Sequence, residues 1–274
     1  MLQIPLARRL ALVLAAAFPL FAASCSDDIG SSSAGASAGS DTLRVQTDSL
    51  LVSVDSLRYT VRIGYPQVAG ASGTVSAAQV AAANGAVRDS VAAFAEAFRP
   101  KTAPGPDASN FDIAEVEGGT EEAFLGGDLF SAVVWIYTFT GGAHGNTSPV
   151  AVNTDLRTGA ALRLGDLFQA GTPWADTLSA RADRALVAKA RGTDDPVSAD
   201  EARATLEPEG YAPAAMPAVR FTLGADSLAL HFEPYEVAYF AFGSTRVPVA
   251  YADLAAMLRP DGPAARLAAR AARR

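Results

Sequence analysis

Strands are indicated most clearly by AVVWIYTF at residues 132–139, VAVNTDL at 150–156 and ALRL at 161–164. The first run is rich in β-branched and aromatic residues, which favour strands. The other two flank Arg157-Thr158-Gly159, a turn-forming triplet. We therefore expect antiparallel strands joined by tight turns.

Further alternating runs lie on both sides of this region. Residues 50–54 and 59–63 alternate between apolar and polar side chains, and so do 219–223 and 228–232. Each pair is separated by a short polar turn, which predicts two more hairpins. A last strand is expected near 246–249.

The clearest helix is predicted between Ser76 and Pro100. Ser76 with Gln79 three residues later forms a capping box, and Pro100 marks the end. Its inward row would consist of Val80, Asn84, Val87, Val91, Phe94 and Phe98.

Helices are also expected in the second half of the chain. Thr172 would cap a helix with Pro173 at its first position, and this helix would run to near Gly192. Shorter helices are expected after Ser198 with Glu201 and at 252–258.

Helices therefore come in blocks rather than after every strand, which favours an α+β fold with antiparallel sheets over a doubly wound parallel sheet. We expect two packed units with a boundary between about 100 and 127. The predicted organisation is a signal (1–24), a flexible tether (25–45), a small N-terminal α+β domain (46–120), a C-terminal α+β domain (121–258) and a basic tail (259–274).

Residues 1–24 are typical of a lipoprotein signal peptide. Arg8 and Arg9 precede an apolar run, and small residues stand directly before Cys25, the only cysteine. Two alternatives are a secretory signal that happens to contain a cysteine and an uncleaved membrane helix. The apolar run is shorter than the ~20 residues of a spanning helix and contains Pro19, which argues against the second. Cys25 is the predicted lipidation site, where a diacylglyceryl group and a further acyl chain such as palmitate would be attached.

The net charge limits the classes of partner that this protein is expected to bind. Removing residues 1–24 takes away two of the 22 basic residues and none of the 29 acidic ones, which leaves a formal net charge of −9. Nucleic acid is therefore not expected as a partner. A second apolar segment long enough to span a membrane is not found, so anchoring by lipid in the bacterial cell envelope is expected. The sequence does not indicate which membrane face would carry the lipid anchor.

His144 is the obvious candidate for catalysis. It lies in a glycine-rich loop, with Asp155 and Asp166 further along the chain, and a histidine near a carboxylate can act as a general base. The sequence favours a structural role, because no nucleophile elbow, metal-ligand spacing or phosphate-binding loop accompanies it. His231 is expected on the outer face of a strand, and no metal site or cofactor is predicted.

A second candidate is the segment from Glu233 to Phe242. Glu233 and Glu236 would suit glycoside cleavage only if they faced each other across a sugar. The nearby aromatic residues are more often core than a ligand platform, although a partly exposed subset would suit partner binding. They are Tyr235, Tyr239, Phe240 and Phe242.

The tail from 259 to 274 has two interpretations. It holds five arginines and one aspartate among alanines. It is compatible with a basic amphipathic helix that touches acidic envelope surfaces. A solvated, frayed terminus is favoured.

Several motifs together resemble the RsiV-like extracytoplasmic domain family. They lie at 137–147, 152–159, 164–168, 232–243 and 247–254, and the first half resembles the smaller domain that usually precedes this one. The resemblance implies a domain of unknown function attached to lipoproteins or membrane anchors, and in some members to a polysaccharide deacetylase. The best understood relative is a membrane-bound anti-sigma factor that binds lysozyme. This chain has no matching sigma-binding segment, transmembrane helix or hydrolase domain.

The sequence therefore predicts a lipid-anchored, non-enzymatic envelope protein that binds a lysozyme-like protein or a glycan such as peptidoglycan. The alternatives are a cell-wall hydrolase or deacetylase accessory enzyme, and a structural lipoprotein without ligand. The candidate binding residues are Tyr137, Gly141, Gly142, His144, Asn146, Tyr235 and Tyr239.

Overall fold

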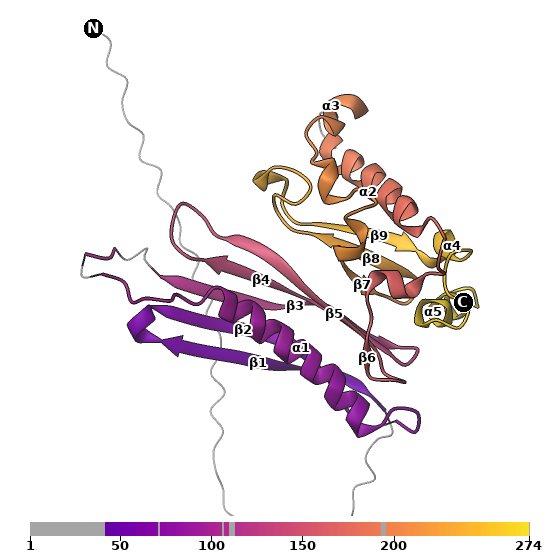
Figure 1. The fold of residues 1–274 in the computed structure, drawn as a ribbon, viewed down its shortest axis with the longest axis horizontal. Coiled ribbons are helices and arrows are strands. Elements are labelled where there is room, and N and C mark those ends of the chain that lie inside the picture. Colours follow the sequence, from indigo (N-terminus) through magenta and orange to yellow (C-terminus); the bar gives the residue numbers. More distant parts are fainter. Residues whose placement is uncertain (1–41, 71, 106, 110–112, 193–195, 274) are drawn as a thin grey trace, which may run out of the picture. The chain divides into compact units, whose positions relative to one another are not determined.

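The computed structural model describes residues 42–273, apart from 71, 106, 110–112 and 193–195 (Figure 1). All of them belong to one compact unit, residues 39–274. Its α+β fold confirms the predicted class. The signal, Cys25 and the tether up to residue 41 lie outside the described residues.

The larger sheet has six strands in the order β1-β2-β3-β4-β5-β6. Neighbours are antiparallel except for β2 and β3, which run parallel. The hairpins predicted around residues 55–58 and 157–159 are both present. The strands are β1 (Arg44–Val54), β2 (Tyr59–Ala69), β3 (Ala114–Gly126), β4 (Leu129–Phe139), β5 (Asn146–Asp155) and β6 (Ala160–Ala161).

Strand β3 was not predicted. Gly118-Gly119 and Glu121-Glu122 interrupt its hydrophobic alternation, and its register with β4 shifts between Thr120 and Glu122. Gly118 is required there, because an added Cβ would lie 2.4 Å from the Trp135 carbonyl oxygen. The strand passes through residue 120, where the sequence placed the boundary between the two units.

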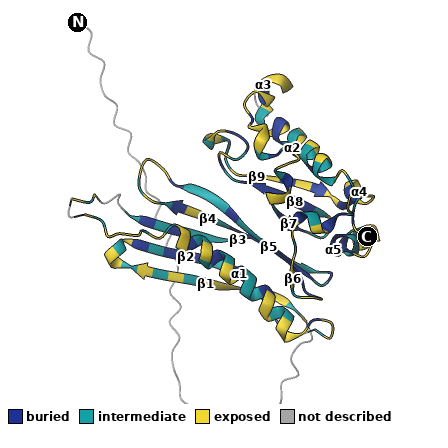
Figure 2. Cartoon of the chain, viewed as in Figure 1, coloured by how far each residue is buried: buried dark blue, intermediate teal, exposed yellow. Residues whose placement is uncertain are grey.

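Helix α1 (Ala77–Ala97) packs against the six-stranded sheet through Val87 and Val91. The capping box is confirmed: Ser76 Oγ accepts from the Gln79 amide, and Gln79 Oε1 accepts from the Ser76 amide. Asn84, placed in the inward row, bonds both backbone groups of Val68, at 2.7 and 2.9 Å. This side chain therefore ties the helix to β2. Figure 2 shows α1 with an exposed outer face.

The second sheet has three antiparallel strands in the order β7-β8-β9. It forms a separate apolar cluster with the helices of the C-terminal half. The predicted hairpin at 219–232 and the strand near 246–249 are confirmed. These elements are β7 (Arg220–Leu223), β8 (Ser227–Phe232), β9 (Thr245–Ala250), α2 (Trp174–Arg191), α3 (Ala199–Arg203), α4 (Tyr251–Leu254) and α5 (Pro263–Ala271).

The sheets contact each other through β4, β5 and β7. Ser131 on β4 donates to Asn153 Oδ1 on β5 (2.6 Å) and accepts from the Leu223 amide on β7 (2.7 Å). Asn153 in turn donates to the Phe221 carbonyl oxygen (2.8 Å). The first six residues of β4 are buried for this reason: α1 covers one face of the strand and the second sheet covers the other.

Two local predictions were wrong. Thr172 does not cap α2, because its hydroxyl donates to the Gln169 carbonyl oxygen instead (2.7 Å) and the helix starts after Pro173. The expected frayed tail contains α5, whose Leu267 is buried against the core of the second sheet. The apolar stripe of this helix outweighs the tendency of a terminus to fray.

Candidate functional site

His144 lies in the loop between β4 and β5, close to two glycines whose backbone conformation other residues rarely adopt. Gly141 and Gly142 have φ angles of 93° and 96°, which agrees with the predicted turn role. A Cβ on Gly145 would lie 2.4 Å from the Tyr137 ring. His144 Nδ1 lies 2.9 Å from the Gly145 carbonyl oxygen, and since that oxygen can only accept, Nδ1 carries the proton in this hydrogen bond.

The segment after β8 brings a row of aromatic rings to this loop. The His144 ring stacks on Phe240, with centroids 4.2 Å apart and planes 27° apart. Phe240 also contacts Tyr235, with centroids 5.4 Å apart. Tyr137 packs over Gly145, next to His144. We call these four residues, Tyr137, His144, Tyr235 and Phe240, the aromatic surface.

The aromatic surface is open to solvent. The exposed fraction is 58% for Tyr235 and 40% for Tyr137. Tyr239, the residue before Phe240, is 57% exposed, and its ring contacts Phe242 at 6.2 Å. Large apolar rings that could be buried are usually buried, so a group of exposed rings marks a binding surface.

Tyr235 has a φ angle of 70°, in the left-handed region. A residue with a Cβ pays roughly 1–2 kcal/mol for this conformation. The turn is held by the Glu236 amide, which donates to the Glu233 carbonyl oxygen (3.2 Å), and by the Glu236 carboxylate, which accepts from the Glu233 amide (2.9 Å). Backbone strain of this kind concentrates at functional sites.

The two carboxylates beside Tyr235 share one arginine. Arg220 lies 3.1 Å from Glu233 and makes two contacts of 3.2 Å with Glu236. Burial raises the pKa of Glu236, while its hydrogen bond to the Glu233 amide and the charge of Arg220 act to lower it. The carboxylates thus face a cation rather than each other across an open cleft.

The remaining candidate residues take separate places. Tyr239 contacts Phe242, and Lys189 Nζ lies 4.3 Å from the centre of the Phe242 ring. Burial lowers the pKa of Lys189. Asn146 pairs with Thr138 in the sheet, and its side-chain oxygen is buried. The carboxylates considered beside His144 have other partners: Asp155 pairs with Arg266, and Asp166 accepts from the Arg163 amide.

The prediction that His231 lies on an exposed face of its strand was wrong. The strand face that carries His231 packs against the six-stranded sheet. The side chain is 1% exposed, and Nε2 lies 2.8 Å from Thr222 Oγ1. Thr222 donates to Glu122 on β3 (3.2 Å), and Glu122 also pairs with Arg246. Burial lowers the His231 pKa to about 4, although Glu122 acts in the opposite direction.

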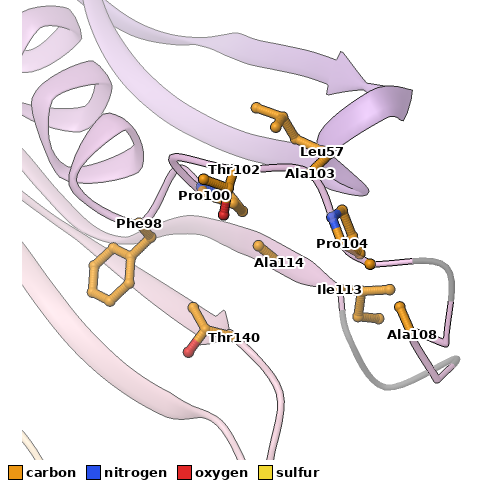
Figure 3. A pocket seen from close by; sticks show the side chains of 11 residues that line it. Leu57, Phe98, Pro100, Thr102, Ala103, Pro104, Ala108, Ile113, Ala114 and Thr140 are labelled. Atoms are coloured by element: carbon orange, nitrogen blue, oxygen red, sulfur yellow. The ribbon is translucent and has the colours of Figure 1, made fainter.

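A pocket of about 550 Å³ lies at the end of α1 (Figure 3). Its lining combines apolar side chains with exposed polar atoms and comes from Leu57 before β2, the loop after α1, the start of β3 and Thr140. The described residues that line it include no titratable side chain. They are Leu57, Phe98, Pro100, Thr102, Ala103, Pro104, Gly105, Ala108, Ile113, Ala114 and Thr140.

Two further searches covered the described residues. Among them, no three or more His, Cys, Asp or Glu side chains are grouped so that they could hold a metal ion. The helices of this part of the chain are all too short or too polar to cross a bilayer.

Sequence reasoning identified the exposed members of the aromatic surface but not their link. Phe240, the ring that joins the two loops, was not among the candidate binding residues, because the aromatic residues of its segment were judged more often core than a ligand platform. His144 and Phe240 lie in loops that connect strands of different sheets, so no sequence spacing signals their contact. The aromatic run 239–242 next to Tyr235 was the available signal.

No family model and no curated protein matches the chain. Solved structures that are similar to it include two of the DUF3298 family. A DUF3298 family member from Bacteroides fragilis NCTC 9343 has a TM-score of 0.60 at 14% identity, over 84% of this chain and all of the other. A DUF3298 family protein from Pseudomonas aeruginosa PAO1 has a TM-score of 0.51 at 15% identity, over 80% of this chain and 94% of the other. The chain therefore shares the fold of these two DUF3298 family proteins, which belong to a domain family of unknown function.

Proposed function

We propose that this protein is a lipid-anchored, non-enzymatic binding module of the bacterial cell envelope, and that its aromatic surface binds a protein partner. The observation that carries the proposal is the exposed row of rings from two loops, with Tyr235 and Phe240 in contact and His144 stacked on Phe240. The cell-envelope address rests on the signal at residues 1–24 and on Cys25.

The chemistry of these side chains supports a protein partner. Tyrosine provides a large contact area and a polar tip while only two side-chain torsions have to be fixed, and aromatic residues are enriched at the centres of protein interfaces. The rings are held by each other and by the glycine-rich loop, so little further ordering is needed on binding. The formal net charge of −9 favours a basic partner, such as a lysozyme-like protein.

Two contacts support a non-enzymatic role. Both carboxylates that would serve a glycosidase are paired with Arg220. His144 is engaged by the Gly145 carbonyl oxygen and by Phe240, whereas its candidate acidic partners are paired elsewhere.

The test uses the mature chain from residue 25 with lysozyme and insoluble peptidoglycan as baits, over a range of salt concentrations. Saturable binding to lysozyme that survives moderate salt supports the proposal, because purely electrostatic contacts between exposed charges are screened. Tyr235→Ala should weaken this binding at least about tenfold, as expected for an interface anchor. Leu51→Ala is the matched control, since Leu51 is 70% exposed on β1 and away from the aromatic surface.

Three results would overturn the proposal. Binding to peptidoglycan alone would assign a glycan ligand instead. Equal affinity for lysozyme in the Tyr235→Ala and Leu51→Ala variants would remove the aromatic surface from the interface. Turnover of peptidoglycan that disappears in His144→Ala would make the protein an enzyme.

A further inference from the structure

The start of the described chain lies at one end of the six-stranded sheet. Arg44 pairs with Ala69 at the end of β2, and Thr42 contacts Gly70 so closely that a Cβ there would lie 2.4 Å from the Thr42 carbonyl oxygen. A few residues further, Thr74 donates to Asp128 in the turn between β3 and β4. Cys25, if acylated, would reach this end through residues 26–41.

The basic helix α5 packs at the same end. Arg266 donates to Asp155 (2.9 Å) and to the carbonyl oxygen of Gly127 (3.4 Å), which precedes Asp128 in that turn. A Cβ on Gly127 would lie 2.9 Å from Leu267 of the helix. Figure 1 shows α5 and β6 at the end of the sheet that lies away from the loop between β4 and β5.

This end carries exposed positive charge although the protein as a whole is acidic. Arg259, Arg270 and Arg273 are exposed, and none of them forms an ion pair with another described residue. Of the neighbouring acids, Asp128 and Asp155 are paired with arginines, whereas the exposed Asp226 near the C-terminal half of α5 forms no ion pair with another described residue. Asp261 is the one acidic residue between 259 and 273. We call Arg259, Arg270 and Arg273 the basic edge.

We infer that the basic edge binds anionic phospholipid headgroups, so that this end faces the membrane and the aromatic surface points away from it. The inference rests on the anchoring at Cys25 that belongs to the proposed function. Even fully extended, the 18 residues between Cys25 and Arg44 would span at most about 65 Å. An acyl anchor at Cys25 would keep the basic edge within this reach of the bilayer, which would raise its effective concentration at the headgroups.

The physical basis is short-range electrostatics. Charges at a membrane surface are screened beyond about 8 Å at physiological salt, so the arginines must approach the headgroups closely. Because Arg259, Arg270 and Arg273 are exposed, they can make this approach, whereas Arg266 is already paired with Asp155. An orientation set in this way would keep the aromatic surface accessible to a partner that approaches from the solution, on the side away from the membrane.

The test measures co-sedimentation of the mature chain carrying Cys25→Ser, which removes the acyl anchor. The probes are vesicles of phosphatidylcholine and vesicles of phosphatidylcholine mixed with phosphatidylglycerol. Binding is expected only to the mixed vesicles. The triple variant Arg259→Gln, Arg270→Gln, Arg273→Gln should lose about fivefold in affinity per arginine. Arg266 is kept, so that its partly buried pair with Asp155 and the packing of α5 stay intact.

A matched control removes three exposed arginines elsewhere. Arg88→Gln, Arg99→Gln, Arg191→Gln makes the same change in net charge on α1, just after α1 and at the end of α2. Its affinity should change less than about twofold. Equal loss in both triple variants, equal binding to both kinds of vesicle, or equal capture by duplex DNA would overturn the inference.

The lysozyme assay separates the two proposals. The basic-edge variant should bind lysozyme as the wild type does, whereas Tyr235→Ala should bind vesicles as the wild type does. Mass spectrometry of the acylated N-terminal peptide tests the anchor itself. An unmodified Cys25 would overturn the orientation without bearing on the aromatic surface.

Discussion

His144 and Phe240 stack with ring centroids 4.2 Å apart, although they come from loops of different sheets. The contact joins the glycine-rich loop after β4 to the segment that carries Tyr235 and Tyr239. Neither loop alone would present the row of exposed rings. The candidate binding surface therefore depends on the docking of the second sheet against the first.

The first prediction concerns this stack. His144→Ala and Phe240→Ala should show a coupling energy of about 0.5–1.5 kcal/mol in a double-mutant cycle of unfolding free energies, the range typical of aromatic pairs. Urea denaturation of the four proteins measures it. Strictly additive losses would mean that the rings do not stack in solution.

The second prediction concerns Tyr235. Tyr235→Ala keeps the left-handed backbone and its strain, whereas Tyr235→Gly relieves it. The glycine variant should be more stable than the alanine variant by roughly 1 kcal/mol, and both should bind the partner weakly. Thermal unfolding compares them. A glycine variant that is less stable than the alanine variant would argue against the positive φ angle.

The third prediction concerns pH. Burial holds the pKa of His231 at about 4 in the folded protein, against an ordinary value of 6.5. The unfolded chain therefore binds a proton before the folded chain does, and stability falls as the pH drops from about 6.5 to about 4. The loss amounts to about 3 kcal/mol for this group, at 1.36 kcal/mol per pKa unit.

His231→Gln tests this account. The titratable and charged groups around His231 are Glu122, Arg220 and Arg246, and all of them are kept in the variant. Its unfolding free energy should depend less steeply on pH in that window than that of the wild type. Leu51→Ala, an exposed substitution that removes no titratable group, is the control and should keep the wild-type slope. Parallel curves for wild type and His231→Gln would refute the assignment.

The fourth prediction concerns Asn84, whose side chain bonds both backbone groups of Val68. Asn84→Ala should lower the unfolding free energy by about 1–3 kcal/mol, because a partly buried backbone donor and acceptor lose their partners. Arg88→Ala, on the exposed side of the same helix, should cost less than about 0.5 kcal/mol. Comparable losses in the two variants would show that Asn84 does not hold α1 to β2.

Local patterns predicted much of the fold. The capping box at Ser76 and the turn at 157–159 depend on contacts between near neighbours, and both were found. Strand β3 was missed because its glycines and glutamates break the alternation, and because its parallel pairing with β2 is a long-range contact. The sequence carries no direct sign of such pairing.

The site was predicted in part for the same reason. Tyr235 and Tyr239 were recognised from their residue types, but the contact of His144 with Phe240 needs both sheets in place. His231 was misplaced because an alternating strand shows which residues share a face and not what covers that face. Here the second face meets β3 through Glu122 and Thr222.

The most direct test is a backbone and side-chain NMR titration of the mature chain with lysozyme. The account predicts that resonances of Tyr137, His144, Tyr235 and Phe240 shift first and saturate together, while Phe98 in the pocket of Figure 3 stays unchanged. Shifts centred on Phe98 and Ile113, or a saturable complex that leaves the aromatic surface unperturbed, would contradict it.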